Sequence, residues 1–86
     1  MKKKEIYIDF NDVNQDILLF CAFRYALGRR TYVVGTLVSI LKANWDHMSP
    51  LRRGMFKKEI REAIDRDMCG SKYDIEEWQR ILNLED

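Results

Sequence analysis

Hydrophobic side chains recur along most of the chain at three- and four-residue spacing, which places residues on one face of an α-helix. This pattern predicts four helices joined by short connections. Their expected ranges are about 12–27, 31–46, 50–67 and 74–82. The predicted fold class is therefore mainly α: a compact four-helix domain with a short N-terminal extended arm or a single β-strand. We expect one domain over residues 1–86, with the arm over 1–11 and the helical core over 12–84.

Polar capping residues mark the expected helix starts. The signals are Asp12 with Gln15, Ser49 before Pro50, and Asp74 with Glu77. Thr31 is a candidate cap for the second helix, and Gly28 suits the left-handed position that ends the first. Gly35 lies inside the second helix, where we expect it to permit close contact with the first.

The first helix is apolar nearly all round from Ile17 onward. We therefore expect it to be the central and most buried element, with Cys21 inside its core. The predicted core of the domain consists of Ile17, Phe20, Leu27, Val34, Val38, Leu41, Phe56, Ile60, Ile64 and Trp78.

Residues 5–10 alternate in the manner of a strand, with Ile6, Ile8 and Phe10 on one side. No second strand candidate follows, so the backbone of this arm lacks an obvious partner in its own chain. One interpretation is that the arm pairs across a homodimer or onto the sheet edge of another protein. The other is that it folds back, with its apolar side chains packed between the helices.

Composition narrows the classes of function. The 86 residues carry 15 basic and 14 acidic side chains, a net charge of +1, which argues against coating nucleic acid through bulk charge. Two cysteines are too few for a disulfide framework, so a reducing cytosol is the expected setting. No membrane span is expected, and Glu5 and Asp9 interrupt what would be the apolar part of a signal peptide.

Residues that could support catalysis are scarce. His47 is the single histidine and is expected in a loop, while Cys21 is expected in a helix core and Cys69 in a turn. Neither a nucleophile–base pair nor a zinc-binding spacing results from these three residues. We therefore expect no enzyme, no cofactor and no metal site.

Candidate binding residues gather where the first two helices meet. Arg24, Tyr25, Arg29, Arg30 and Tyr32 surround one glycine, and Arg and Tyr are enriched in binding hot spots. For Arg24 a structural interpretation competes, in which it is a buried strut that bonds a helix end, Asp16 or an acid of the fourth helix.

A second candidate surface lies on the third helix. Arg53, Lys57 and Arg61 share one helix face, and no acid interrupts the row. This basic row is either a solvated helix face or a set of contacts to phosphates or to an acidic protein surface.

One stretch of the chain resembles a known group. The run Phe23 to Tyr32, which includes Phe-Arg-Tyr-Ala-Leu-Gly-Arg, is followed by Asn44-Trp45-Asp46, Lys58 to Ile64 and Glu77 to Arg80. Together these segments look like a group of small proteins encoded by bacteriophages and prophages, over roughly residues 18–82. The group has no general assigned activity, so the resemblance implies no catalytic residues. It implies a bacterial cytosolic setting and a protein that binds and blocks a host or defence component.

The resulting functional hypothesis is a non-enzymatic, phage-type binding protein that blocks a host macromolecule. Its most concrete form is an inhibitor of a CRISPR effector or of another antiphage system, with a host or defence protein, or a nucleoprotein, as partner. One alternative is a small nucleic-acid-binding regulator, although the spacing matches a helix-turn-helix poorly. Another is a phage structural or assembly protein that oligomerises through its arm.

Overall fold

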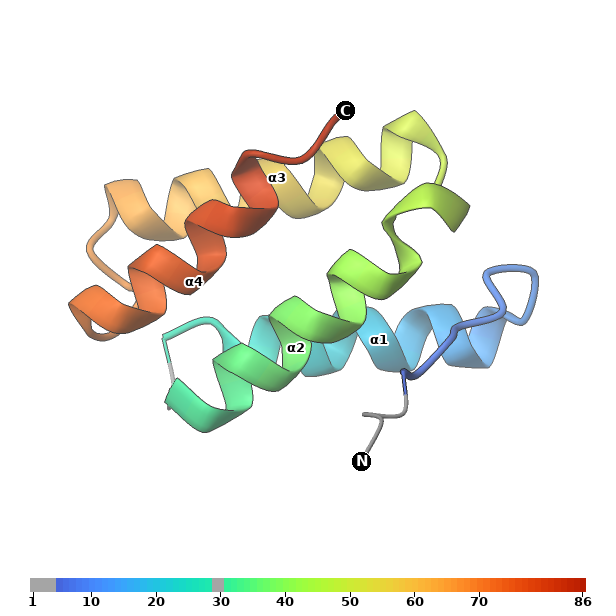
Figure 1. The fold of residues 1–86 in the computed structure, drawn as a ribbon, viewed down its shortest axis with the longest axis horizontal. Helices are drawn as coiled ribbons and strands as arrows, with labels where there is room; N and C mark the ends of the chain where they lie inside the picture. Colours follow the sequence, from blue (N-terminus) through green and yellow to red (C-terminus); the bar gives the residue numbers. More distant parts are fainter. Residues whose placement is uncertain (1–4, 29–30) are drawn as a thin grey trace.

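The computed structural model of the chain describes residues 5–28 and 31–86, and these residues form four α-helices in two hairpins (Figure 1). The elements are α1 (Val13–Ala26), α2 (Thr31–Asn44), the short 3-10 helix η1 (Trp45–His47), α3 (Pro50–Asp65) and α4 (Lys72–Leu82). The predicted mainly α fold is confirmed. No strand occurs within the described ranges.

Side-chain caps fix two of the helix starts where the sequence predicts them. The Asp12 side chain accepts from the backbone N–H of Asn14, and the Ser49 side chain accepts from that of Arg52 at the start of α3. Gln15 does not complete the expected box with Asp12, because its side-chain oxygen accepts from the backbone N–H of Asp9.

The predicted cap of α4, Asp74, is wrong by three residues. Ser71 is the cap, and Asp74 is the third helical residue, whose Oδ2 accepts from the backbone N–H of Ser71 at 3.0 Å. The Ser71 hydroxyl in turn accepts from the backbone N–H of Asp74. This reciprocal arrangement satisfies two backbone donors, which is why the helix begins before Asp74 and not after it.

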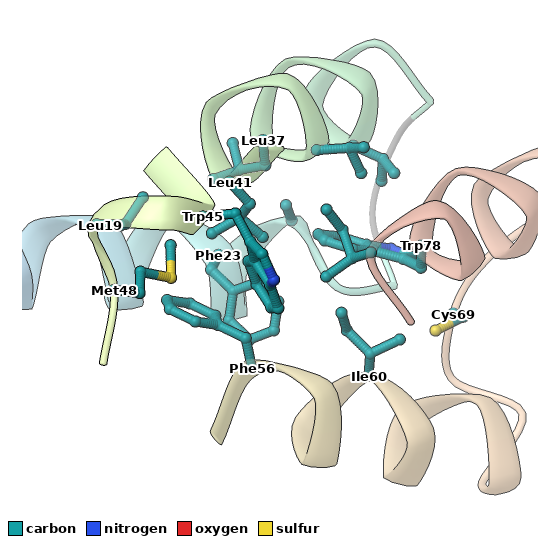
Figure 2. Close-up of a cluster of buried hydrophobic side chains, with 14 residues drawn as sticks. Leu19, Phe23, Leu37, Leu41, Trp45, Met48, Phe56, Ile60, Cys69 and Trp78 are labelled. Atoms are coloured by element: carbon teal, nitrogen blue, oxygen red, sulfur yellow. The ribbon is translucent and has the colours of Figure 1, made fainter. Parts of the chain in front are cut away.

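The hydrophobic core lies where all four helices face one another (Figure 2). Phe23 of α1 stands at its centre, with the Phe56 ring 4.8 Å away and the Trp78 ring 5.4 Å away, both nearly perpendicular to it. Edge-to-face aromatic pairs of this kind add stability beyond the burial of their area. α1, α3 and α4 are therefore joined through one aromatic cluster.

The structure corrects the predicted core mainly in α1. Six of the predicted core residues are buried, namely Val34, Val38, Leu41, Phe56, Ile60 and Trp78. Phe20, Leu27 and Ile64 are half-buried at its edge. Ile17 is 54% exposed, because α1 buries its opposite side through Leu19, Phe23 and Ala26. The expectation that Cys21 lies in the core is also wrong, since Cys21 is exposed, and the buried cysteine is Cys69 in the connection between α3 and α4.

The two glycines of the first hairpin have different roles. Gly28 has a φ of +79°, as expected, and a Cβ added there would lie 2.4 Å from the backbone oxygen of Met68. It therefore permits the α1–α2 connection to approach the α3–α4 connection closely. The expected close helix contact at Gly35 is wrong, because a Cβ there would meet no described atom within 4 Å.

The N-terminal arm folds back onto its own chain. The Asn44 side chain accepts from the N–H of Ile8 and donates to the carbonyl of Ile6, each at 2.8 Å, so it acts in place of a neighbouring strand. Ile8 and Phe10 pack against the core, while Ile6 remains 53% exposed. This geometry agrees with the second of the two interpretations of the arm, and it gives two of the arm's backbone groups partners within the chain.

Within residues 5–28 and 31–86, no helix is long and apolar enough to cross a membrane.

Candidate functional site

The outward side of α1 carries a set of exposed apolar residues, with the exposed Asn14 among them in the first turn. At three- and four-residue spacing it exposes Val13, Ile17, Leu18, Cys21, Ala22 and Tyr25, which we call the outer face of α1. Leu18 is 67% exposed, although leucine is ordinarily among the more buried residue types. Soluble monomers seldom expose a large apolar patch unless it binds something, which makes this face a candidate contact surface.

Two ion pairs with α3 border this face. Asp16 pairs with Arg52, and the Arg24 guanidinium lies 3.2 Å from the Glu59 carboxylate. Arg24 also lies 6.0 Å from the centre of the Phe20 ring. It is therefore a strut between helices, but its partner lies on α3 and its side chain is 58% exposed, so the expectation of a buried strut is wrong.

The predicted cluster of Arg and Tyr residues is described in part. Arg24 and Tyr25 lie next to each other in the last turn of α1, both well exposed. Arg29 and Arg30 lie outside the described residues, and so does the side chain of Tyr32 in the first turn of α2. The described part of this corner is therefore the pair Arg24 and Tyr25, at the C-terminal end of the outer face.

The predicted basic row of α3 is largely occupied by the chain itself. The Arg53 guanidinium donates to the backbone oxygens of Trp45 and Asp86, at 2.8 and 3.0 Å. The Lys57 ammonium donates to the backbone oxygen of Leu84 and, at 2.6 Å, to the Asp86 carboxylate. Arg53 and Lys57 therefore do not form an open row of solvated or phosphate-binding cations.

Lys57 departs most from the predicted basic row, because it is only 4% exposed. Its ammonium lies 5.9 Å from the centre of the Trp45 ring, and the indole N–H of Trp45 donates to the backbone oxygen of Glu85. A buried ammonium must find such acceptors, since an unpaired charge is costly to desolvate. We call Trp45, Arg53 and Lys57, with the residues 84–86 that they hold, the C-terminal clasp.

Arg61 is the exposed member of the basic row. The hydrogen bond and charge of Lys57 lower the pKa of Asp86 below its usual range, and the charge of Arg61 contributes in the same direction. Lys57 and Arg61 therefore act on the Asp86 side-chain carboxylate, while Arg53 bonds the Asp86 backbone oxygen, and these contacts hold residues 84–86 against α3.

The candidate catalytic residues do not assemble. The His47 ring meets the Tyr7 ring edge-on at 6.2 Å, away from any thiol contact in the described part of the chain. Burial, and secondarily the charge of Asp74, raises the pKa of the Cys69 thiol, which weakens it as a nucleophile. Among residues 5–28 and 31–86, no group of three or more His, Cys, Asp or Glu side chains could hold a metal ion.

Two hollows flank the N-terminal arm. One, of about 630 Å³, lies between residues 7–11 and His47, and the other, of about 450 Å³, lies between the arm and the outward side of α2. Neither hollow includes a thiol, and neither adjoins the outer face of α1. They follow from the way an extended segment crosses a helix surface.

The exposed residues of this face that the sequence analysis does not single out as binding candidates are Val13, Ile17, Leu18, Cys21 and Ala22. A signal for them exists in the sequence, because Val13, Ile17, Cys21 and Tyr25 recur every four residues on a different side of the helix from Leu19, Phe23 and Ala26. A helix packed on one side of a four-helix domain buries only one of two such stripes.

Comparisons with family models, with curated proteins and with solved structures find no match for this chain.

Proposed function

We propose that this protein is a non-enzymatic binding protein of the bacteriophage type, which blocks a host macromolecule in the bacterial cytoplasm. The observation that carries the proposal is the pair Arg24 and Tyr25, where a ring 62% exposed stands beside a guanidinium side chain 58% exposed. Tyrosine and arginine are the residue types that dominate binding energy at protein interfaces. An exposed pair of them beside an apolar helix face favours a protein target.

The same pair lies inside the segment that resembles small phage proteins, Phe23 to Arg29. That resemblance supports the biological setting by analogy, not by chemistry. The most concrete form of the proposal is an inhibitor of a CRISPR effector or of another antiphage system. The target in that case is a defence protein or a nucleoprotein that contains one.

Both side chains of this corner already reach the surface. Tyr25 supplies a rigid ring with a polar tip, and the neighbouring outer face supplies apolar area. In the Arg24–Glu59 ion pair the Arg24 side chain is 58% exposed and that of Glu59 30%, and surface ion pairs contribute only about 0–1 kcal/mol. Arg24 can therefore exchange Glu59 for an acidic group of a target at small cost.

The nucleic-acid alternative has less support. Two of the three cations of the predicted row, Arg53 and Lys57, already hold backbone oxygens of residues 84–86. Phosphate contacts through these side chains would first have to displace that segment. The net charge of +1 adds no general attraction for nucleic acid.

The test uses two tyrosines of similar exposure. Wild-type protein, Tyr25→Ala and the control Tyr73→Ala are immobilised and exposed to nuclease-treated lysate of a bacterial host, and captured proteins are then purified for affinity measurement. Tyr73 is 71% exposed but lies on α4. We expect Tyr25→Ala to weaken target binding about 10- to 30-fold, the scale of a hot-spot residue, and Tyr73→Ala to leave it unchanged.

A restriction assay with the host's own CRISPR system tests the concrete form. Expression of the wild type or Tyr73→Ala should restore plasmid or phage survival, and Tyr25→Ala should not. Equal affinity of both variants for the captured target would contradict the assigned surface. Recovery of nucleic acid alone, lost on nuclease treatment, would favour the regulator instead.

A further inference from the structure

We propose that the C-terminal clasp is a binding site for an acidic peptide segment of a partner protein, and that residues 84–86 occupy it as an internal ligand which such a segment displaces. The proposal goes beyond the proposed function, because it uses no residue of the Arg24–Tyr25 corner. The segment that follows α4 runs alongside α3, where the donors of the clasp hold it (Figure 1).

The three donors of the clasp contact the backbone of residues 84–86 in order. The Lys57 ammonium donates to the carbonyl of residue 84, the Trp45 indole N–H to that of residue 85, and the Arg53 guanidinium to that of residue 86. Three successive carbonyl oxygens thus have one side-chain donor each. In peptide recognition, hydrogen bonds to the main chain give affinity, and contacts to the side chains give specificity. This pattern therefore favours a peptide as the ligand.

The side chains of the internal ligand indicate which peptides fit. The Asp86 carboxylate lies 2.6 Å from the Lys57 ammonium, and the charge of the exposed Arg61 acts on the same carboxylate. Leu84, two residues earlier, packs against the hydrophobic core. A fitting segment therefore has an apolar residue followed two positions later by an acidic one. A nucleic acid supplies phosphates, but it has neither a main chain of successive carbonyls nor the apolar side chain.

Burial divides the clasp into a fixed side and an exchangeable side. Trp45 and Lys57 are each 4% exposed and belong to η1 and α3, whereas the Asp86 side chain is 82% exposed and lies beyond the end of α4. Release of residues 84–86 alone would break the hydrogen bonds of the donors without replacing them. Exchange for a segment with the same acceptors restores these bonds. The internal ligand lowers the apparent affinity for the partner, because only the open fraction of the molecules can bind it.

The binding test uses a fluorescein-labelled, amidated peptide with the sequence of residues 82–86, Leu-Asn-Leu-Glu-Asp. Fluorescence anisotropy measures its affinity for the full chain. Asp86→Ala weakens the internal ligand, so this variant should bind the peptide about tenfold more tightly than the wild type does. Addition of Lys57→Met to Asp86→Ala should lower the affinity by about tenfold or more, because the ammonium donor is lost. Addition of Lys58→Met, at an exposed position, is the matched control and should leave the affinity unchanged.

NMR of the full chain labelled with nitrogen-15 follows the displacement itself. Titration with the unlabelled peptide should move the amide signals of Glu85 and Asp86 to random-coil positions, because these residues leave the clasp. The amide signal of Tyr73, on α4, should stay in place as a control. Peptide binding that leaves the signals of Glu85 and Asp86 unchanged would contradict displacement.

Two further probes define the ligand class. The same peptide with Gln and Asn in place of its two acids should bind more weakly, and a short single-stranded DNA should not displace residues 84–86. Arg53→Gln in the Asp86→Ala background is a second donor variant, and circular dichroism shows that each variant folds. The proposal is overturned if Asp86→Ala binds the peptide no better than the wild type does, or if the donor variants leave its affinity unchanged. Displacement by the DNA and not by the peptide would also overturn it.

Discussion

α1 and α3 contrast in their expected burial: the sequence predicts that α1 is the most buried helix and that α3 carries a row of basic residues on one face. The structure differs from both expectations. α1 is apolar nearly all round from Ile17 onward, yet Ile17 and Leu18 are more than half exposed. α3 carries the densest basic run, yet Lys57 is only 4% exposed. Position relative to the neighbouring helices decides burial here, because each helix has one side toward the aromatic cluster around Phe23. The apolar excess of α1 is left exposed, and Arg53 and Lys57 of α3 belong to the clasp.

The two sides of α1 should differ most in stability. Phe23→Ala removes the ring at the centre of the aromatic cluster and should lower the free energy of unfolding by about 3–5 kcal/mol. Ile17→Ala, on the outer face, should change it by less than about 1 kcal/mol at low protein concentration. Urea unfolding measures both. Equal losses would mean that α1 is buried all round.

Two adjacent lysines of α3, one buried and one exposed, test whether the contacts of the buried Lys57 stabilise the domain. Lys57→Met keeps the aliphatic stem but removes the donor to Leu84 and Asp86, and it should cost about 1–3 kcal/mol. Lys58→Met, at an exposed position, should change stability by less than about 0.5 kcal/mol. Thermal unfolding compares them. If Lys57→Met stabilised the domain, the clasp would not contribute to folding.

Sequence predicts the helices well because capping and spacing are local. Asp12, Ser49 and Pro50 act through neighbours in the chain, so their signals survive without tertiary structure. Which stripe of α1 faces inward depends on rings from α3 and α4, and no local signal encodes that choice. The prediction therefore placed Ile17 in the core and left out Phe23.

The residues of the candidate site also divide into those that residue type predicts and those that depend on distant partners in the chain. Arg24 and Tyr25 were found by residue type, and both are exposed as a contact surface requires. The role of Lys57 could not be predicted, because its acceptors lie 27 and 29 residues away along the chain. Asn44 was missed for the same reason, since it bonds the arm across 36 and 38 residues.

A substitution at Gly35 tests whether α2 packs closely against another helix at this position. Because a Cβ there meets no described atom within 4 Å, Gly35→Ala should raise the free energy of unfolding by about 0.5–1 kcal/mol. Chemical denaturation of this variant measures the effect. A loss of stability would instead support the close helix contact that the sequence suggests at this position.

The smallest expected effect is the pH dependence of the clasp. The pKa of Asp86 is lowered by the hydrogen bond and charge of Lys57, so its contribution to stability is present above the pKa of the unfolded chain. It is lost as the pH falls through the lower pKa of the folded protein. Carbon-13 NMR titration should show the Asp86 pKa rising toward its ordinary value in Lys57→Met. An unchanged value would remove Lys57 as its cause.

The reactivity of the two thiols tests most directly whether the outer face of α1 is exposed. Cys21 lies in the middle of the outer face and is exposed, whereas Cys69 is 1% exposed in the core. Titration of the folded protein with a chromogenic disulfide reagent at low concentration should therefore modify one thiol per chain quickly. The second thiol should react only on unfolding, and Cys21→Ser should remove the fast phase. Slow reaction of both thiols, or a fast phase that survives in Cys21→Ser, would contradict an exposed outer face on α1.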